Sequence, residues 1–189
     1  VPEASEFISR LAERAIQGLT EKDMGAPERI QRFRTLLTDG FDVPQIGRFV
    51  LGRYWRLASE DERTEYLKLF EDYIVQNYAT RFGEYAGENV RVGNASQNAD
   101  GDVSVYSEIV RPSGAPIKVD WKLRRADKSF KIVDVAVEGV SMAITQRDDF
   151  SASIQRSGGK VEGLLAMLRP TYGRGGHSGN ILFREDASR

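Results

Sequence analysis

Residues 129–150, SFKIVDVAVEGVSMAITQRDDF, constrain the fold more than any other segment because they predict a strand, a tight break and a helix in sequence. Alternation places apolar side chains on both faces of the strand: Phe130 and Ile132 on one, and Val133, Val135 and Val137 on the other. Such a strand lies inside a sheet that is covered on both sides. Gly139 supplies the break because glycine adopts positive φ at little cost, and the apolar spacing after it predicts a helix through Phe150.

The segment before this strand predicts the rest of the sheet. Apolar alternation indicates strands near 90–92, 103–109 and 117–124, and turn-forming residues separate them at 98–101, 112–114 and 125–128. The third strand alternates most strictly, with Ile117, Val119, Trp121 and Leu123 opposite Lys118, Asp120, Lys122 and Arg124. It therefore has one buried and one solvated face. Four such strands in succession predict an antiparallel meander.

Helical patterns flank the sheet on both sides. An amphipathic helix is predicted over 3–19, a second from Pro27 to about Gly40, short helices over 41–58, and a long helix over 59–86. Ser59 and Glu62 form a capping box at the start of the long helix, and 151–168 are helical with a break at 158–159. The fold class is therefore α+β, a four-stranded antiparallel meander packed against N-terminal and C-terminal helices. We expect one domain over 1–169, with helical 1–86, sheet 87–137 and helical 138–169, and a glycine-rich tail over 170–189.

Composition argues against most catalytic and nucleic-acid functions. Lys and Arg (27) balance Asp and Glu (28), so the net charge of −1 provides no drive toward nucleic acid. There are no cysteines, and the single histidine, His177, lies in the tail, so we expect no metal, no cofactor and no nucleophilic catalysis. No apolar run reaches the roughly 18 to 20 residues of a membrane-spanning helix. The first residue is not Met, which fits either a chain after signal removal or an expression boundary.

One enzymatic alternative stays open. A curved sheet can hold an aspartate base in an apolar pocket, as in isomerases of similar architecture. Asp120 is predicted on the solvated side of its strand. Asp134 is predicted on the side of Phe130 and Ile132, where it is half-buried, and we favour a structural ion pair with an arginine there.

Several motifs in order resemble one family. They are the run from Lys131 to Ser141, then Arg147 and Phe150, then Gly158-Gly159 and 163–165, and upstream Phe41-Asp42, Ile46, 51–55 and Ala58. Together they resemble the periplasmic phospholipid-binding family called MlaC or toluene-tolerance Ttg2, over about residues 5 to 168. The departures are Gln146, where an aromatic is expected, and the tail.

The resemblance implies a periplasmic carrier that shuttles phospholipid and keeps it in a lipid-sized cavity between sheet and helices. The implied partners are an outer-membrane lipoprotein complex and an inner-membrane ABC transporter with an MCE-domain subunit, which together maintain outer-membrane lipid asymmetry. Enclosing a two-tailed lipid hides about 30 methylenes from water, which is worth on the order of 20 kcal/mol.

The family pattern implies a set of site residues in this chain. The cavity wall would comprise Phe41, Phe49, Leu51 and Trp55 from the helical cover, Val105, Val119, Trp121 and Val135 from the sheet, and Met142 and Phe150 from the last helices. Arg53 and Arg147 are candidates to meet a phosphate, because guanidinium geometry suits bidentate contact. The same apolar residues are equally compatible with an ordinary core, and the arginines with structural salt bridges.

Three further functions remain compatible with the sequence. A hopanoid or other isoprenoid carrier would need a flatter and more rigid cavity. A cone-shaped-sheet enzyme would need a pocket aspartate beside a hydroxyl donor. An adaptor would have a solid core and an exposed apolar patch.

Overall fold

The computed structural model describes residues 1–170, which form two compact units. The first, here the sheet unit, comprises Val1–Asp42 and Ala79–Met142. The second, here the helical unit, comprises Val43–Tyr78 and the described residues from Ala143 onward. The tail predicted over 170–189, with His177, lies outside the described residues except for Pro170.

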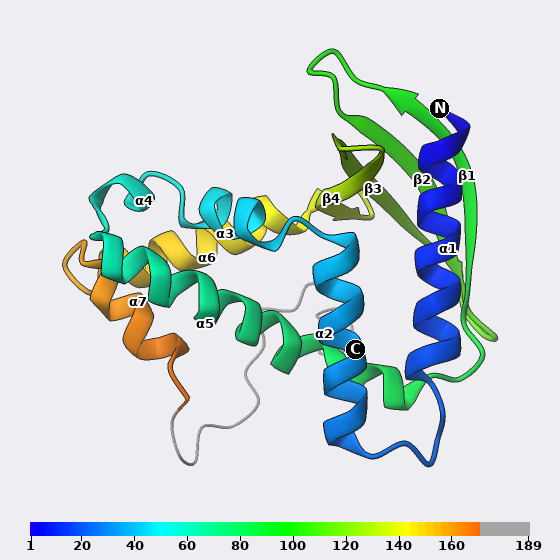
Figure 1. The fold of residues 1–189 in the computed structure, drawn as a ribbon, viewed down its shortest axis with the longest axis horizontal. Coiled ribbons are helices and arrows are strands. Elements are labelled where there is room, and N and C mark those ends of the chain that lie inside the picture. Colours follow the sequence, from blue (N-terminus) through cyan, green and yellow to red (C-terminus); the bar gives the residue numbers. More distant parts are fainter. Residues whose placement is uncertain (171–189) are drawn as a thin grey trace. The chain divides into compact units, whose positions relative to one another are not determined.

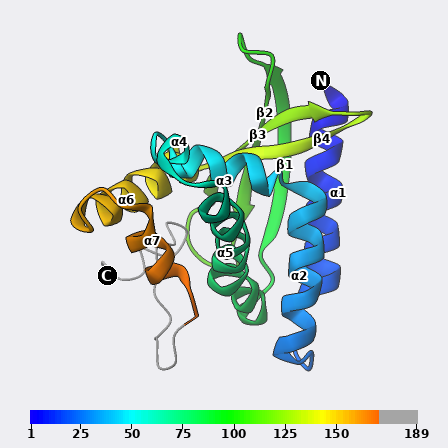
Figure 2. The same cartoon turned by 60° about the vertical axis from the view of Figure 1, so that its left-hand side comes forward.

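Two long helices open the sheet unit and lie side by side (Figures 1 and 2). They are α1 (Pro2–Leu19) and α2 (Ala26–Gly40), and each has a proline in its first turn, where the missing N–H costs no hydrogen bond. The buried Arg29 of α2 donates from Nε to Leu19 O (2.9 Å) and from Nη2 to Glu21 O (2.6 Å). This side chain thereby supplies the donors that the end of α1 lacks. Both helix predictions are confirmed.

The sheet contains five antiparallel strands in the order β1-β2-β3-β4-β5, so the predicted meander is confirmed but its strand count was wrong. The strands are β1 (Asn89–Gln97), β2 (Val103–Val110), β3 (Ile117–Ala126), β4 (Ser129–Val137) and β5 (Val140–Ser141). The extra strand exists because Glu138 and Gly139 both have positive φ (50° and 80°) and form a two-residue hairpin turn. The chain therefore pairs back on β4 before the helix begins.

A β-bulge in β4 corrects the predicted faces of that strand. Lys122 pairs with Asp134 whereas Leu123 pairs with Ile132, so Val133 is an extra residue without a partner of its own. The alternation shifts by one position at this point. Val135 consequently packs with Phe130 and Ile132 instead of opposite them, and Asp134 moves to the other face.

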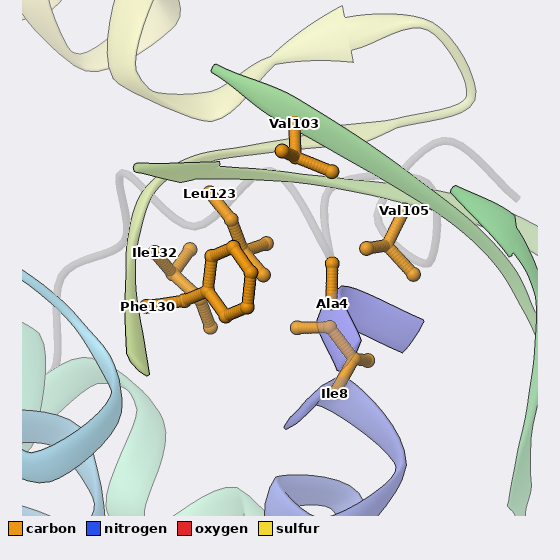
Figure 3. Packing of buried hydrophobic residues seen from close by; sticks show 7 residues of the cluster. All are labelled: Ala4, Ile8, Val103, Val105, Leu123, Phe130 and Ile132. Carbon is orange, nitrogen blue, oxygen red and sulfur yellow. The ribbon is translucent and has the colours of Figure 1, made fainter. Parts of the chain in front are cut away.

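The core of the sheet unit lies between α1 and one face of the sheet (Figure 3). Its buried members are Ala4, Ile8, Val103, Val105, Leu123, Phe130 and Ile132. The two helical residues are four apart and so share one face of α1, which the amphipathic helix buries against the sheet. Phe7 adds an edge-to-face contact with Phe130, the ring centroids being 6.0 Å apart.

The helical unit consists of α3 (Val43–Leu51), α4 (Tyr54–Leu57), α5 (Glu60–Tyr78), α6 (Met142–Arg156, of which Met142 belongs to the sheet unit) and α7 (Val161–Leu168). The long helix predicted over 59–86 was too long, because α5 ends at Tyr78 and a 3-10 helix, η1 (Ala79–Glu84), follows in the sheet unit. The predicted capping box is confirmed: Glu62 N donates to Ser59 Oγ (3.1 Å) and Ser59 N donates to Glu62 Oε1 (2.9 Å).

Aromatic side chains fill the interior of the helical unit. The Tyr66 hydroxyl donates to Gly47 O at 2.7 Å, and burial raises the pKa of this phenol. A Cβ at Gly47 would lie 3.0 Å from the Phe70 ring, so glycine allows α3 to approach α5 closely. Among residues 1–170, no helix has the length and apolar character that crossing a bilayer requires.

Candidate functional site

The sheet presents one largely apolar face, here the inner face, which is wider than the core that α1 covers. Strand register aligns its members across three strands: Val103, Val105, Ser107 and Ile109 on β2, Ile117, Val119, Trp121 and Leu123 on β3, and Phe130, Ile132, Val135 and Val137 on β4. The cluster under α1 does not include Ile109, Ile117, Val119 or Val137, here called the distal end. Three of these four are half-buried, and Val119 is buried. The apolar surface therefore continues past α1.

Trp121 lies between the core cluster and the distal end. Its Nε1 donates to Ser107 Oγ (2.9 Å), and the Ser107 hydroxyl in turn donates to Val119 O (2.6 Å). Each polar hydrogen thus has an acceptor, and the indole N–H needs no water. The inner face can accordingly receive hydrocarbon without leaving the donors of Trp121 and Ser107 unpaired.

Six of the twelve predicted site residues belong to the sheet unit. Val105 is a member of the core cluster, and three more of the six pack against that cluster: Phe41, Trp121 and Val135. The backbone next to Phe41 is held by a hydrogen bond from Asp42 N to Ile132 O (2.9 Å). Val119 lies further along the inner face, at the distal end. Met142 is half-buried and follows β5. The structure therefore gathers five of these six residues on or beside one sheet face.

The other six belong to the helical unit, where two of them form a cation–π pair. The Arg147 guanidinium lies 4.6 Å from the centroid of Phe49, whose side chain is 39% exposed. Gly52 has φ +61°, and a Cβ there would lie 3.3 Å from Arg147 Cδ. Glycine thus leaves room for the arginine stem to cross the backbone. Arg147 has no carboxylate partner recorded within residues 1–170.

The remaining predicted residues of this unit are packed or engaged. Leu51 and Phe150 are buried, and Phe150 makes an edge-to-face contact with Tyr73 at 5.6 Å. Arg53 Nη2 donates to the Tyr54 hydroxyl at 2.8 Å, which lowers the pKa of that phenol. Trp55 lies under the guanidinium groups of Arg48 and Arg63. Arg147 is consequently better placed than Arg53 to meet an external anion.

Sequence reasoning omitted Ser107, Ile109, Ile117 and Val137 from the site. The apolar three could have been found, because each continues the alternation of a strand whose other members were chosen. Ser107 could not, because a small polar residue in a strand gives no signal until its neighbour across the sheet is known.

The two aspartates of the enzymatic alternative lie on the outer face of the sheet. Asp120 pairs in register with Tyr106, and Asp134 with Lys122. The Asp134 carboxylate accepts hydrogen bonds from Val135 N (2.7 Å) and from the Ser141 hydroxyl (2.5 Å). Neither carboxylate therefore lies among the apolar side chains of the inner face.

A separate pocket of about 410 Å³ lies in the sheet unit among α1, the end of α2 and the β3–β4 turn. Phe7, Leu11 and Phe130 supply its apolar part, and its charged rim includes an Arg10–Glu6 pair and an Arg14–Asp39 pair. None of the twelve predicted residues lines it. Within residues 1–170, no cluster of three or more His, Asp or Glu side chains is arranged for a metal ion.

Comparison with known proteins gives consistent matches. The family model described as MlaC protein matches residues 9–170. The intermembrane phospholipid transport system binding protein MlaC of Haemophilus influenzae is 30% identical over 100 residues, which are 51% of this chain and 47% of that protein. Toluene tolerance protein ttg2D of Pseudomonas putida is 24% identical over 110 residues, which are 58% of this chain and 51% of that protein. The matched region spans about half the length of each relative.

A solved structure agrees with these matches. The phospholipid-binding protein from Ralstonia solanacearum, in complex with a phospholipid, superposes with a TM-score of 0.78 over 88% of this chain and 94% of that one, at 19% identity. It therefore shares the fold. Because the family model matches far more than half of the sequence, this chain belongs to the MlaC family.

Proposed function

We propose that this protein is a periplasmic phospholipid carrier whose inner sheet face holds acyl chains. The observation that carries the proposal is the distal end, an apolar surface that continues beyond the core cluster under α1. Membership of the MlaC family supports it, as do the phospholipid transport role of the relative from Haemophilus influenzae and the bound phospholipid in the structure from Ralstonia solanacearum.

Among the sheet residues we assign acyl-chain contact to Trp121 and to the three half-buried residues of the distal end, Ile109, Ile117 and Val137, with Val135 beside them. Val105 and Val119 are 0% and 2% exposed, so their role in this proposal is structural support. In the helical unit, taken by itself, Arg147 is our candidate for contact with a phosphate, because its guanidinium lies over the Phe49 ring and keeps its N–H donors for an anion.

A pair of adjacent substitutions tests the acyl-chain surface. Ile109 and Val110 are both half-buried at the end of β2, but alternation places Ile109 on the inner face and Val110 on the outer face. Protein purified without detergent, extracted with organic solvent and analysed by mass spectrometry is expected to yield phospholipid. Ile109→Lys should lose most of it, because a charge would lie against hydrocarbon, whereas Val110→Lys should keep it.

Three outcomes would contradict this proposal. Extraction that finds no lipid in the native protein removes its basis. Equal retention by the two variants shows that the wrong face was chosen. A polycyclic isoprenoid in place of phospholipid would identify the alternative carrier. Circular dichroism of both variants confirms that each is folded before retention is compared.

We further propose that the lipid is delivered unchanged between an outer-membrane lipoprotein complex and an inner-membrane ABC transporter with an MCE-domain subunit. The transport-system name of the Haemophilus influenzae relative supports this part. Labelled phospholipid incubated with the protein should exchange onto acceptor vesicles with its mass unaltered. Accumulation of lysolipid or free fatty acid would indicate an enzyme instead.

A further inference from the structure

The short helix α4 ends in the most exposed large apolar side chain recorded for the described residues. Leu57, its last residue, is 69% exposed, at the turn where the chain passes from α3 to α5 (Figure 1). A single exposed leucine is common on protein surfaces and indicates nothing by itself. The residues around Leu57 make it informative, because arginines and the Trp55 indole lie in the same segment, at the end of α3 and in α4.

Three arginines of this segment have no carboxylate partner among residues 1–170. Within residues 1–170, no salt bridge to a carboxylate is recorded for Arg48, Arg53 or Arg56, and all three are exposed. Three acidic residues, Glu60, Asp61 and Glu62, follow in the first turn of α5, where the positive end of the helix dipole already favours them. Within the described residues, the guanidinium groups of Arg48 and Arg56 therefore remain available to an external anion, and Arg53, which gives one N–H to the Tyr54 hydroxyl, keeps its others.

A fourth arginine fixes the geometry of the segment. Arg63 donates from Nε to Trp55 O (2.8 Å) and from Nη2 to Arg56 O (3.5 Å), and so serves carbonyls at the end of α4. Its guanidinium also lies 5.1 Å from the centroid of the Trp55 ring, and that of Arg48 lies 5.5 Å from the same ring. The half-buried indole is thus held beside the Arg48 cation, for which residues 1–170 supply no carboxylate.

We propose that the arginine–tryptophan tip, defined as Arg48, Arg53, Trp55, Arg56 and Leu57, docks the protein on an anionic phospholipid surface. Guanidinium groups match lipid phosphates, indole rings reside at headgroup depth, and an exposed leucine at the end of a short helix can enter the acyl boundary. Positive charge on the protein and negative charge on the membrane surface are complementary. Docking goes beyond the proposed carrier function, because it does not require the inner face to hold a lipid.

Vesicle co-sedimentation tests the proposal with the full chain. Native protein is expected to bind vesicles of phosphatidylglycerol and phosphatidylcholine in equal amounts, to bind phosphatidylcholine alone weakly, and to dissociate as salt rises. The double variant Arg48→Gln/Arg56→Gln should weaken binding roughly 30-fold, on the scale of surface arginines near an anionic membrane. Leu57→Ser should weaken binding to the same vesicles through lost insertion, with no change in salt dependence.

A charge-matched control separates docking from bulk electrostatics. Lys68 and Lys160 are exposed, lie in the same unit and fall outside the tip, so Lys68→Gln/Lys160→Gln removes the same charge. This control should bind vesicles nearly as well as the native protein. Equal weakening by the two double variants, or native binding that ignores phosphatidylglycerol, would overturn the proposal.

Tryptophan fluorescence adds a readout at the tip itself. The chain contains two tryptophans, so Trp121→Phe leaves Trp55 as the single reporter. Its emission should shift to the blue when anionic vesicles are added, and an unshifted spectrum would contradict docking through this residue. Co-purified lipid measured on Arg48→Gln/Arg56→Gln distinguishes the two proposals. If this variant no longer docks on vesicles but retains lipid, the carrier function stands without the tip. If the protein docks on vesicles but carries no lipid, only the docking proposal stands.

Discussion

Trp121 connects the structural core of the sheet to the surface assigned to lipid. It packs against the core cluster on one side, neighbours Val119 and Val135 on the inner face, and satisfies its own N–H through Ser107. Tyr106, on the adjacent strand, has the opposite orientation and is 44% exposed. Substitutions at Trp121 and Tyr106 therefore test the inner face and the outer face of the same sheet.

We predict that Trp121→Lys loses co-purified lipid and that Tyr106→Lys keeps it. The first substitution puts an ammonium group on the apolar face, and the second puts it opposite Asp120, where it is solvated. Quantitative lipid extraction measures the difference, and circular dichroism reports folding. Loss of lipid in both folded variants would mean that retention depends on the outer face as well.

Arg124 has a structural role on the outer face. Its Nε and Nη2 donate to the two carboxylate oxygens of Asp102, each at 3.0 Å, and the Asp102 side chain is 7% exposed. Removing the arginine leaves a buried carboxylate without its bidentate partner.

We therefore predict that Arg124→Gln lowers the free energy of unfolding by about 1–3 kcal/mol, the range expected when a buried polar group loses its partner. Arg91, in an exposed pair with Glu108 at 2.7 Å, provides the control. Arg91→Gln should change stability by less than about 0.5 kcal/mol. Urea titration measures both, and equal effects would show that burial of Asp102 contributes nothing.

At the scale of elements, helices and their boundaries follow from local signals. The capping box of α5 could be predicted because Ser59 and Glu62 are three residues apart and pair through a local side-chain and backbone interaction. The end of α5 could not, since no glycine or proline marks Tyr78 and the chain continues as a 3-10 helix. Local chemistry determines where that helix starts, whereas its end depends on packing.

Sheet faces follow from local alternation only while the register is regular. The bulge at Val133 is invisible in the sequence because every residue from Lys131 to Val137 is compatible with a strand. Its position is set by pairing with Lys122 and Leu123 on the preceding strand, which the pattern of β4 alone does not reveal. The sequence therefore predicted that the candidate site is an apolar sheet face that includes Trp121. It placed Val135 on the wrong face relative to Ile132.

An ion-pair junction joins α7 to α5 within the helical unit. Arg169, just after α7, donates to both carboxylate oxygens of Glu65 on α5 (2.7 and 2.8 Å) and also pairs with Glu162 at 2.6 Å. The hydrogen bond from Arg169 holds the pKa of the Glu65 carboxyl below its ordinary value. A carboxyl with a lowered folded-state pKa stabilises the fold above its unfolded pKa and loses that contribution as pH falls through the folded value.

We predict that Arg169→Gln lowers the melting temperature at pH 7 and that this difference shrinks below about pH 4, the ordinary range of a glutamate. Thermal unfolding followed by circular dichroism at several pH values measures the effect. Arg10→Gln, which removes an exposed pair with Glu6 on α1, should show little difference at any pH. A pH-independent loss in Arg169→Gln would indicate that packing, not the carboxylate pairing, links the two helices.

At the scale of the whole molecule, carriage and stability are linked through mass action. A ligand that binds the folded chain and not the unfolded one stabilises it by RT ln(1 + [L]/Kd), about 2.7 kcal/mol when the free ligand is at 100 times Kd. If acyl chains occupy the inner face, protein that retains its lipid unfolds at a higher temperature than protein stripped of it. Lipid supplied back to the stripped chain should restore the difference.

We predict that this lipid-dependent increase in melting temperature follows the inner face of the sheet. Ile109→Lys should melt at the same temperature with and without added lipid, whereas Val110→Lys should gain as much as the native chain, because its charge lies on the opposite face. Calorimetry of stripped protein before and after incubation with phospholipid measures the increase. A substitution on the distal end that lowers stability without abolishing the increase would place Ile109 in the packing core and the lipid elsewhere.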